Sequence, residues 1–234
     1  MHDATLRARP RALLVQPPVY DFALYDLFLQ PLGLLRIGAW LAGAGYEVGL
    51  LDGLSGGRPR RDGPGRGKMR REQVPTPEVL SDLGRSYARY GMTREELRRR
   101  MMEATPDVVL ITSGMTYWYP GVAEVAEIAH ELFPAVPVLI GGVYATLLPD
   151  HCRSIAPYAH VLPGDASVEL ARILGREGLP RPSGLLPQNP LPGGAEQQAS
   201  RIQGAAVLRL HAGCRSRCTY CASRMLAPQF TPRD

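Results

Sequence analysis

The amino-acid sequence predicts an α/β fold in which helices cover both faces of a doubly wound parallel sheet. Short apolar runs alternate along residues 11–175 with segments that have helical periodicity, which is typical of this fold class. The run Val108–Ile111 is continuously apolar, as expected of a strand that is buried on both faces. In such folds ligands bind at the carboxyl ends of the strands.

Five strands and three helices account for most of this region. The strands are expected within residues 11–18, 46–53, 106–116, 136–142 and 160–165. The first helix, within 31–46, has Pro31 in its first turn and ends near the glycines 43 and 45. The second, 122–133, places Glu124, Glu127 and Glu131 away from its apolar stripe, and the third runs from a capping Ser167 to Gly175.

Two segments interrupt this pattern. Residues 53–105 form an insertion whose second half is expected to be helical, with a capping box of Thr93 and Glu96 and ion pairs Glu95–Arg99 and Glu96–Arg100. Residues 176–204 are rich in Pro, Gly and Gln and are predicted to be an interdomain linker. The expected organisation is therefore a domain over 1–175, a linker over 176–204 and a second unit over 205–234.

The charge pattern argues against a nucleic-acid partner. The formal net charge is +5, but the basic residues bunch at 58–71 and 94–100 without the interleaved aromatic residues that bind bases. We therefore expect a solvated loop at 58–71. The apolar core near the start, Ala12–Val15, is too short for a secretory signal, and no apolar run is long enough to span a membrane, so a cytoplasmic protein is expected.

Three cysteines lie within eight positions, Cys214-x3-Cys218-x2-Cys221, directly after an apolar run at 205–213 that is expected to be a strand. In a reducing compartment, clustered cysteines are metal ligands more often than disulfides. Three thiolates suit an iron–sulfur cluster that keeps one iron open for a substrate. The alternative is a structural zinc site completed by His211 or Cys152.

The cysteine spacing, with Tyr220 immediately before the last cysteine, resembles the signature of the radical S-adenosylmethionine enzymes. The resemblance implies that Cys214, Cys218 and Cys221 hold a [4Fe-4S] cluster. S-adenosylmethionine would bind the fourth iron, with its adenine near Tyr220, and would be cleaved to a radical when the cluster is reduced. The resemblance also implies an electron donor for the cluster and a small-molecule or peptide substrate.

Residues 11–175 resemble the Rossmann-like cobalamin-binding domain that precedes the barrel in one class of these enzymes. The resemblance is carried by the strands above, by the helix within 31–46 and by the stretch LPGDASVEL at 162–170. It implies that cobalamin binds at the strand ends. The candidate contacts are Ser113, Gly114, Met115, Thr116, Gly141, Gly142, Tyr144 and Gly164.

Two features depart from the pattern of cobalamin proteins. The Asp-x-His-x-x-Gly element that supplies a histidine to cobalt is absent, because Asp150 is followed directly by His151, so no protein imidazole is expected on cobalt. The usual acidic turn is replaced by Gly164-Asp165-Ala166.

The same resemblance makes 205–234 the first strand and cluster loop of an incomplete radical S-adenosylmethionine (β/α) barrel. Only thirteen residues follow Cys221, so a longer gene product or a second chain is expected to supply the rest. The implied function is the amino-terminal part of a cobalamin-dependent radical enzyme that methylates an unactivated carbon. The alternatives are a non-catalytic cobalamin-binding module and a zinc-containing α/β binding protein.

Overall fold

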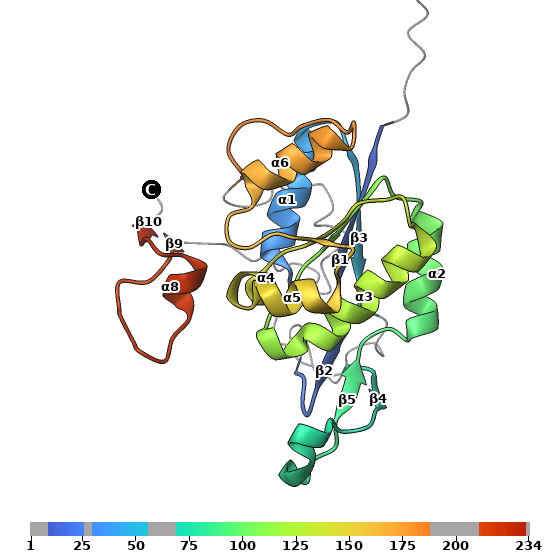
Figure 1. The fold of residues 1–234 in the computed structure, drawn as a ribbon, viewed down its shortest axis with the longest axis vertical. Coiled ribbons are helices and arrows are strands. Elements are labelled where there is room, and N and C mark those ends of the chain that lie inside the picture. Colours follow the sequence, from blue (N-terminus) through green and yellow to red (C-terminus); the bar gives the residue numbers. More distant parts are fainter. Residues whose placement is uncertain (1–8, 26–29, 56–68, 188–210, 233–234) are drawn as a thin grey trace, which may run out of the picture.

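The computed structural model describes residues 9–25, 30–55, 69–187 and 211–232. Its centre is a five-stranded parallel sheet in the order β3-β1-β6-β7-β8 (Figure 1). The strands are β1 (Arg11–Gln16), β3 (Glu47–Asp52), β6 (Val108–Ile111), β7 (Val138–Ile140) and β8 (His160–Val161). Each lies inside a predicted strand, so the predicted parallel sheet is confirmed.

The strand order fixes where a ligand can enter. The chain first places β3 on one side of β1, and it then returns to place β6 on the other side. Loops that leave the two neighbouring strands β1 and β6 therefore diverge to opposite faces, which opens a crevice at their carboxyl ends. In this strand order the crevice is the expected ligand site, and it lies beyond Gln16 and Ile111.

Helices cover both faces of the sheet, as predicted (Figure 1). Leu13 and Val15 of β1 face a core formed with α2 (Arg94–Ala104), α3 (Tyr119–Leu132), α4 (Val143–Leu147) and α5 (Pro149–Ile155). Ala12 and Leu14 face the opposite core, formed with α1 (Leu32–Gly43) and α6 (Ser167–Arg176). Alternate residues of one strand thus bury themselves in two separate layers.

The insertion also forms a small antiparallel sheet that the sequence did not predict. Its order is β2-β5-β4, with β2 (Val19–Asp21) directly after the double proline and β4 (Arg71–Gln73) and β5 (Ala88–Tyr90) from the insertion. A 3-10 helix, η1 (Glu78–Leu83), connects β4 to β5. The sheet extends the domain beyond the carboxyl end of β1 (Figure 1).

A buried ion pair holds this small sheet to the domain. The Arg89 guanidinium of β5 donates two hydrogen bonds to the Glu124 carboxylate of α3, at 2.9 and 2.8 Å. Tyr20 of β2 donates a third, at 2.9 Å. Arg89 and Glu124 are each only 5% exposed. Glu124 therefore does not lie on a solvent face as the helical pattern suggested, because it has a buried partner from the insertion.

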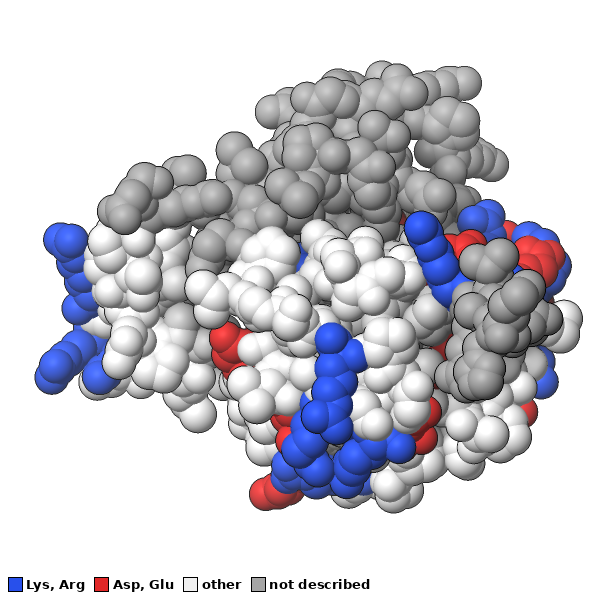
Figure 2. Space-filling model, turned by 90° about the horizontal axis from the view of Figure 1, so that it is seen from above, with Lys and Arg blue, Asp and Glu red and all other residues white. Residues whose placement is uncertain are grey.

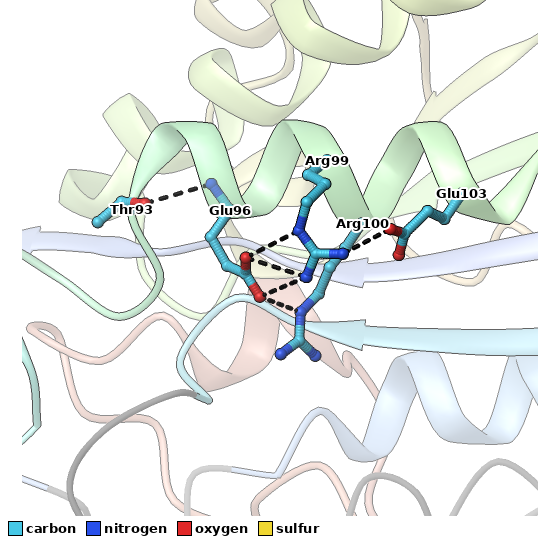
Figure 3. A network of polar contacts seen from close by, with 5 residues as sticks. All are labelled: Thr93, Glu96, Arg99, Arg100 and Glu103. Carbon is cyan, nitrogen blue, oxygen red and sulfur yellow. Dashed lines mark hydrogen bonds and ion pairs between the residues drawn. The ribbon is translucent and has the colours of Figure 1, made fainter.

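The helix α2 confirms the predicted second half of the insertion (Figure 3). The Thr93 hydroxyl caps it by accepting a hydrogen bond from the Glu96 backbone N–H at 3.2 Å. The expected pair of Glu96 and Arg100 is present at 2.6 Å. Arg99, however, pairs with Glu96 and Glu103, where a pair with Glu95 was expected.

The first part of the predicted linker is attached to the domain. Residues 179–187 cross α1, and Leu179 and Leu186 pack against the core beneath it. Three side chains in and after α1 donate to backbone carbonyls there: Trp40 to Ser183 at 3.0 Å, Tyr46 to Pro180 at 2.7 Å and Arg36 to Pro187. Residues 188–204, the rest of the predicted linker, lie outside the described residues.

Two predicted boundaries are corrected. Ser167 is the first residue of α6 and makes no side-chain cap; the Asp165 carboxylate instead accepts from the Ser167 backbone N–H at 3.2 Å, and the helix continues through Gly175 to Arg176. Residues 205–210 of the predicted later strand lie outside the described residues, and β9 (His211–Ala212) pairs antiparallel with β10 (Thr231–Pro232). Among the helices that the structure describes, none has the length and hydropathy needed to cross a bilayer.

Candidate cofactor site

A cavity of about 710 Å³ lies at the carboxyl ends of β6, β7 and β8. Its volume is within the range of small-molecule sites. One wall comes from α1, through Gly33, Leu34, Arg36 and Ile37, and another from the start of α6. The third wall comes from the segment that carries the three cysteines. The cavity therefore lies at the carboxyl edge of the sheet, but over β6, β7 and β8 and not at the crevice between β1 and β6.

Three of the predicted cobalamin contacts, Gly141, Gly142 and Gly164, line this cavity. At Gly142 the absence of a side chain is a requirement: φ is +92°, and a Cβ there would lie 2.6 Å from the Ser113 carbonyl oxygen. Any other residue would push the β7 loop away from the β6 loop. The glycine thus lets the two strand ends meet at the cavity.

Ser113 joins the same two strand ends. Its hydroxyl donates to the Gly141 carbonyl at 3.1 Å and accepts from the Tyr144 backbone N–H at 2.9 Å, while its carbonyl accepts from the Val143 N–H at 2.9 Å. The side chain is buried, at 4% exposure. Ser113 therefore holds the ends of β6 and β7 together at the cavity, and its hydroxyl is used in hydrogen bonds to other residues of the chain.

A second cavity, of about 120 Å³, lies at the crevice between β1 and β6. It is lined by the double proline after β1, by Thr112, Ser113 and Gly114, and by the indole of Trp118. A Cβ on Gly114 would come within 3.0 Å of that indole. The indole N–H donates to the Asp21 carboxylate at 2.8 Å, so β2 helps to fix this wall.

The other predicted contacts do not line either cavity. Met115 is exposed, and Thr116 begins the short helix η2 (Thr116–Trp118). Tyr144 is fully buried in the core beneath α3, where burial raises the pKa of its hydroxyl, and that hydroxyl lies 2.6 Å from His151 Nδ1. The structure therefore places the Tyr144 side chain in the core and not at the edge.

The three cysteines lie in one exposed loop between β9 and α8 (Ser223–Leu226). Gly213, directly before Cys214, has φ +70°, and a Cβ there would lie 2.2 Å from the Gln229 carbonyl oxygen, so only glycine allows the two ends of the loop to cross this closely. The Cys221 sulfur lies 3.1 Å from the Ser223 hydroxyl. Hydrogen bonds from Ser223 lower the pKa of Cys221, which favours the thiolate that binds metals.

In the described ranges, no three Cys, His, Asp or Glu side chains are gathered in a way that could hold a metal ion. Convergence of the three thiols on one centre thus stays a prediction. Cys152 is fully buried on α5, and burial raises its pKa to about 11. This position is wrong for completing a zinc site with exposed cysteines. His211 remains the alternative fourth ligand.

The cysteine segment reaches the cavity through residues on both sides of the loop. These are His211, Ala212, Met225, Leu226, Ala227, Pro228, Thr231 and Pro232. The cysteines and Tyr220 do not line the cavity, and Tyr220 is 90% exposed. Sequence reasoning also missed Arg36 and Leu186. A single arginine in an otherwise apolar helix was the signal for Arg36, whereas nothing marked Leu186.

Part of the chain is similar in sequence to a methyltransferase. No family model matches the chain. The chain is 29% identical over 148 residues to cytidylyl-2-hydroxyethylphosphonate methyltransferase of Streptomyces wedmorensis, an alignment that covers 62% of this chain and 24% of that protein. The chain thus spans about a quarter of the length of this relative.

A solved structure of a cobalamin-binding protein from Desulfitobacterium hafniense DCB-2 is also similar. The TM-score is 0.41 at 13% identity, covering 72% of this chain and 59% of that one. This degree of likeness does not define a fold by itself. The α/β fold of the chain is defined by its own strand order and by the helix layers on both faces.

The residues at the site fit the two predicted cofactors in different ways. The large cavity is lined mainly by apolar side chains and by glycines, and it shares Thr112 with the second, smaller cavity. It can therefore receive part of the bulky ring of cobalamin. The exposed loop offers three thiols and no carboxylate, which is the donor set that iron–sulfur clusters prefer.

Proposed function

We propose that this chain is the amino-terminal part of a cobalamin-dependent radical S-adenosylmethionine enzyme that transfers a methyl group to an unactivated carbon. One observation carries the proposal: the segment with the three cysteines forms a wall of the cavity at the carboxyl edge of the parallel sheet. Cofactors bound at these two places would lie next to each other.

The similarity to a methyltransferase supports the reaction type. The relative is named for the methylation of cytidylyl-2-hydroxyethylphosphonate, and the aligned part covers 62% of this chain. We take methyl transfer from that name as part of the proposal. The substrate class, a small molecule or a peptide, depends on parts of the enzyme beyond the described residues.

In this proposal each part of the chain has a distinct task. Gly141, Gly142 and Gly164 leave room for the corrinoid, and Ser113 fixes the strand ends that face it. Cys214, Cys218 and Cys221 would hold the cluster. When bound, the cluster would supply the electron that cleaves S-adenosylmethionine, and cobalamin would supply the methyl group.

The cysteine assignment is tested by anaerobic reconstitution with iron, sulfide and hydroxocobalamin, followed by metal analysis and an absorption spectrum. We expect about four irons per chain, because the proposed cluster is a cubane. Cys218→Ala should lose the iron and retain the corrinoid absorption. Cys152→Ala is the matched control, because this fourth cysteine is buried outside the loop and its loss should leave the iron content unchanged.

The corrinoid assignment is tested separately by filling the cavity. Ala166 lines the cavity at the start of α6, whereas Val168, two residues later, is 82% exposed and does not. Ala166→Phe should weaken corrinoid binding at least about tenfold, a difference of about 1.4 kcal/mol. Val168→Phe should leave binding unchanged.

Each alternative function gives a different result in these tests. Corrinoid without iron would overturn the radical chemistry and leave a cobalamin-binding module. A colourless protein with one zinc per chain would make it a zinc-containing binding protein. Equal corrinoid binding by both phenylalanine variants would remove the cavity from the proposal.

A further inference from the structure

Part of the wall of the large cavity comes from the predicted linker. Leu186 and Arg36 both line the cavity, and the Arg36 guanidinium donates to the carbonyl of Pro187, directly after Leu186. Leu186 also packs against the apolar core beneath α1. The neighbouring Leu185 does not line the cavity and is 95% exposed. Of these two adjacent leucines, the structure therefore directs only Leu186 toward the space for a ligand.

Residues 179–187, which we call the strap, are rich in proline. Pro180, Pro182 and Pro187 have no backbone N–H, so the strap has few donors with which to form a helix or a strand. Its carbonyls must find donors elsewhere in the fold. Proline also restricts the strap before it docks, which lowers the entropy cost of docking. The strap is therefore suited to lie against a surface that offers donors.

Aromatic side chains in and after α1 supply those donors. The indole N–H of Trp40 donates to the Ser183 carbonyl at 3.0 Å, and the Tyr46 hydroxyl donates to the Pro180 carbonyl at 2.7 Å. Both aromatic side chains are buried, so the two hydrogen bonds are shielded from water. Aromatic residues that pack on a proline-rich segment are a common means of peptide recognition. Trp40 and Tyr46 thus form a latch for the strap.

Contacts with α6 fix the beginning of the strap. The Leu179 backbone N–H donates to the Leu174 carbonyl at 2.8 Å, and the Arg181 side chain occupies the space that a Cβ on Gly175 would need. No ion pair between described residues involves the strap. Uncharged residues form most of the described surface at the end of the molecule where α1 and α6 lie (Figure 2). The strap is therefore attached by hydrogen bonds and apolar packing.

We infer that the strap retains the corrinoid in the large cavity, with Leu186 in contact with the ligand and with Trp40 and Tyr46 as positioning residues. The inference rests on the proposed function, which supplies the ligand. A latched strap keeps Leu186 in the cavity wall, so a bound corrinoid gains an apolar contact that a released strap does not give. The effect is reciprocal: the factor by which the latched strap tightens corrinoid binding is also the factor by which bound corrinoid favours the latched strap.

The contact of Leu186 is tested by equilibrium dialysis of the chain against hydroxocobalamin. Leu186→Ala should weaken binding about tenfold, because it removes three carbon atoms from the cavity wall. Leu185→Ala is the matched control, because it is the same substitution one residue earlier, at a side chain outside the cavity. It should bind like wild type. Equal binding by the two variants would overturn the role of Leu186.

The latch is tested with the double variant Trp40→Phe, Tyr46→Phe, which removes both donors and keeps an aromatic ring at each position. Corrinoid should dissociate about tenfold faster from this variant, because two buried hydrogen bonds no longer hold the strap. Tyr20→Phe is the control, because it removes a hydroxyl donor of the same kind from the small sheet. A purely structural role for the latch would lower stability to urea and leave the dissociation rate of the folded protein unchanged, which would overturn the inference.

Limited proteolysis measures the strap without relying on bound cofactor. Thermolysin cleaves before leucine, so it should cut the strap before Leu185 or Leu186 whenever the strap is released. The double variant should be cut about tenfold faster than wild type in the absence of corrinoid, because cleavage follows the population of the open form. By the same reciprocity, saturating hydroxocobalamin should slow the cut in wild type. Equal cutting of the double variant and wild type would overturn the latch.

The same experiments separate this inference from the proposed function. Corrinoid binding that neither Leu186→Ala nor the double variant changes would overturn the strap alone and leave the proposed function in place. A wild-type chain that binds no corrinoid would overturn the proposed function and the role of the strap together.

Discussion

The buried pair of Arg89 and Glu124 allows a quantitative prediction for stability. In the variant Arg89→Met the Glu124 carboxylate stays buried at 5% exposure, with the Tyr20 hydroxyl as its remaining donor among the contacts above. Two charge-assisted hydrogen bonds, at 2.9 and 2.8 Å, are lost. Breaking a buried pair by removing one partner costs about 3–5 kcal/mol. That is a large fraction of the roughly 5–15 kcal/mol that stabilises a typical domain.

The assay is urea unfolding followed by circular dichroism. The slope of the unfolding free energy against urea concentration should be the same in all variants, so that a shift of the midpoint reports stability. Arg94→Met is the control, because its pair with Glu127 is about half exposed and should contribute less than about 1 kcal/mol. The triple variant Arg89→Met, Glu124→Leu, Tyr20→Phe removes the charges together and should be more stable than Arg89→Met alone. The reasoning is refuted if Arg89→Met costs no more than Arg94→Met.

Two further predictions concern the strand ends and the alkaline limit of the fold. Gly142→Ala should lower the free energy of unfolding by about 1–3 kcal/mol, because φ is positive and the new Cβ would clash with Ser113. Gly164→Ala is the control, because φ there is +66° but the space around it is open, so it should cost less in the same urea assay. Equal costs for the two variants would contradict the argument from the Ser113 contact. Burial and the Glu124 charge raise the pKa of Tyr20 to about 12 from an ordinary 10.0. The folded state thus holds this proton more tightly, so its contribution is complete below pH 10.0 and is lost as pH rises through about 12. Unfolding measured across that window should show a steeper loss in wild type than in Tyr20→Phe, and parallel curves would contradict the shift.

Residues 179–187, the first part of the predicted linker, are docked onto α1. Leu186 and Arg36 both line the large cavity, and Arg36 also holds the backbone at Pro187. The start of the expected linker is therefore a wall of the site and not a free tether. Proline and glycine content predicted a linker, but it carried no information on where the backbone would pack.

The sequence by itself determined the parallel sheet, its two helix layers and the cysteine loop. Apolar periodicity and capping residues act within a few positions, as at Val108–Ile111 and at Thr93, so they can be read locally. The spacing of Cys214, Cys218 and Cys221 is likewise local, and it is sufficient to identify the loop.

Only the tertiary structure decided the contacts between distant segments. The strands Val19–Asp21 and Ala88–Tyr90 are three residues each, too short to show a period, and they are defined by pairing with each other. Glu124 follows the pattern of a solvent-facing helical residue, and it is buried because Arg89 neutralises it. The Tyr144 side chain is fully buried in the core, and its hydroxyl contacts His151, an exposed residue of α5, at 2.6 Å. Whether a polar side chain is buried depends on the partners that the folded chain brings to it from distant segments. The local sequence pattern does not contain this information.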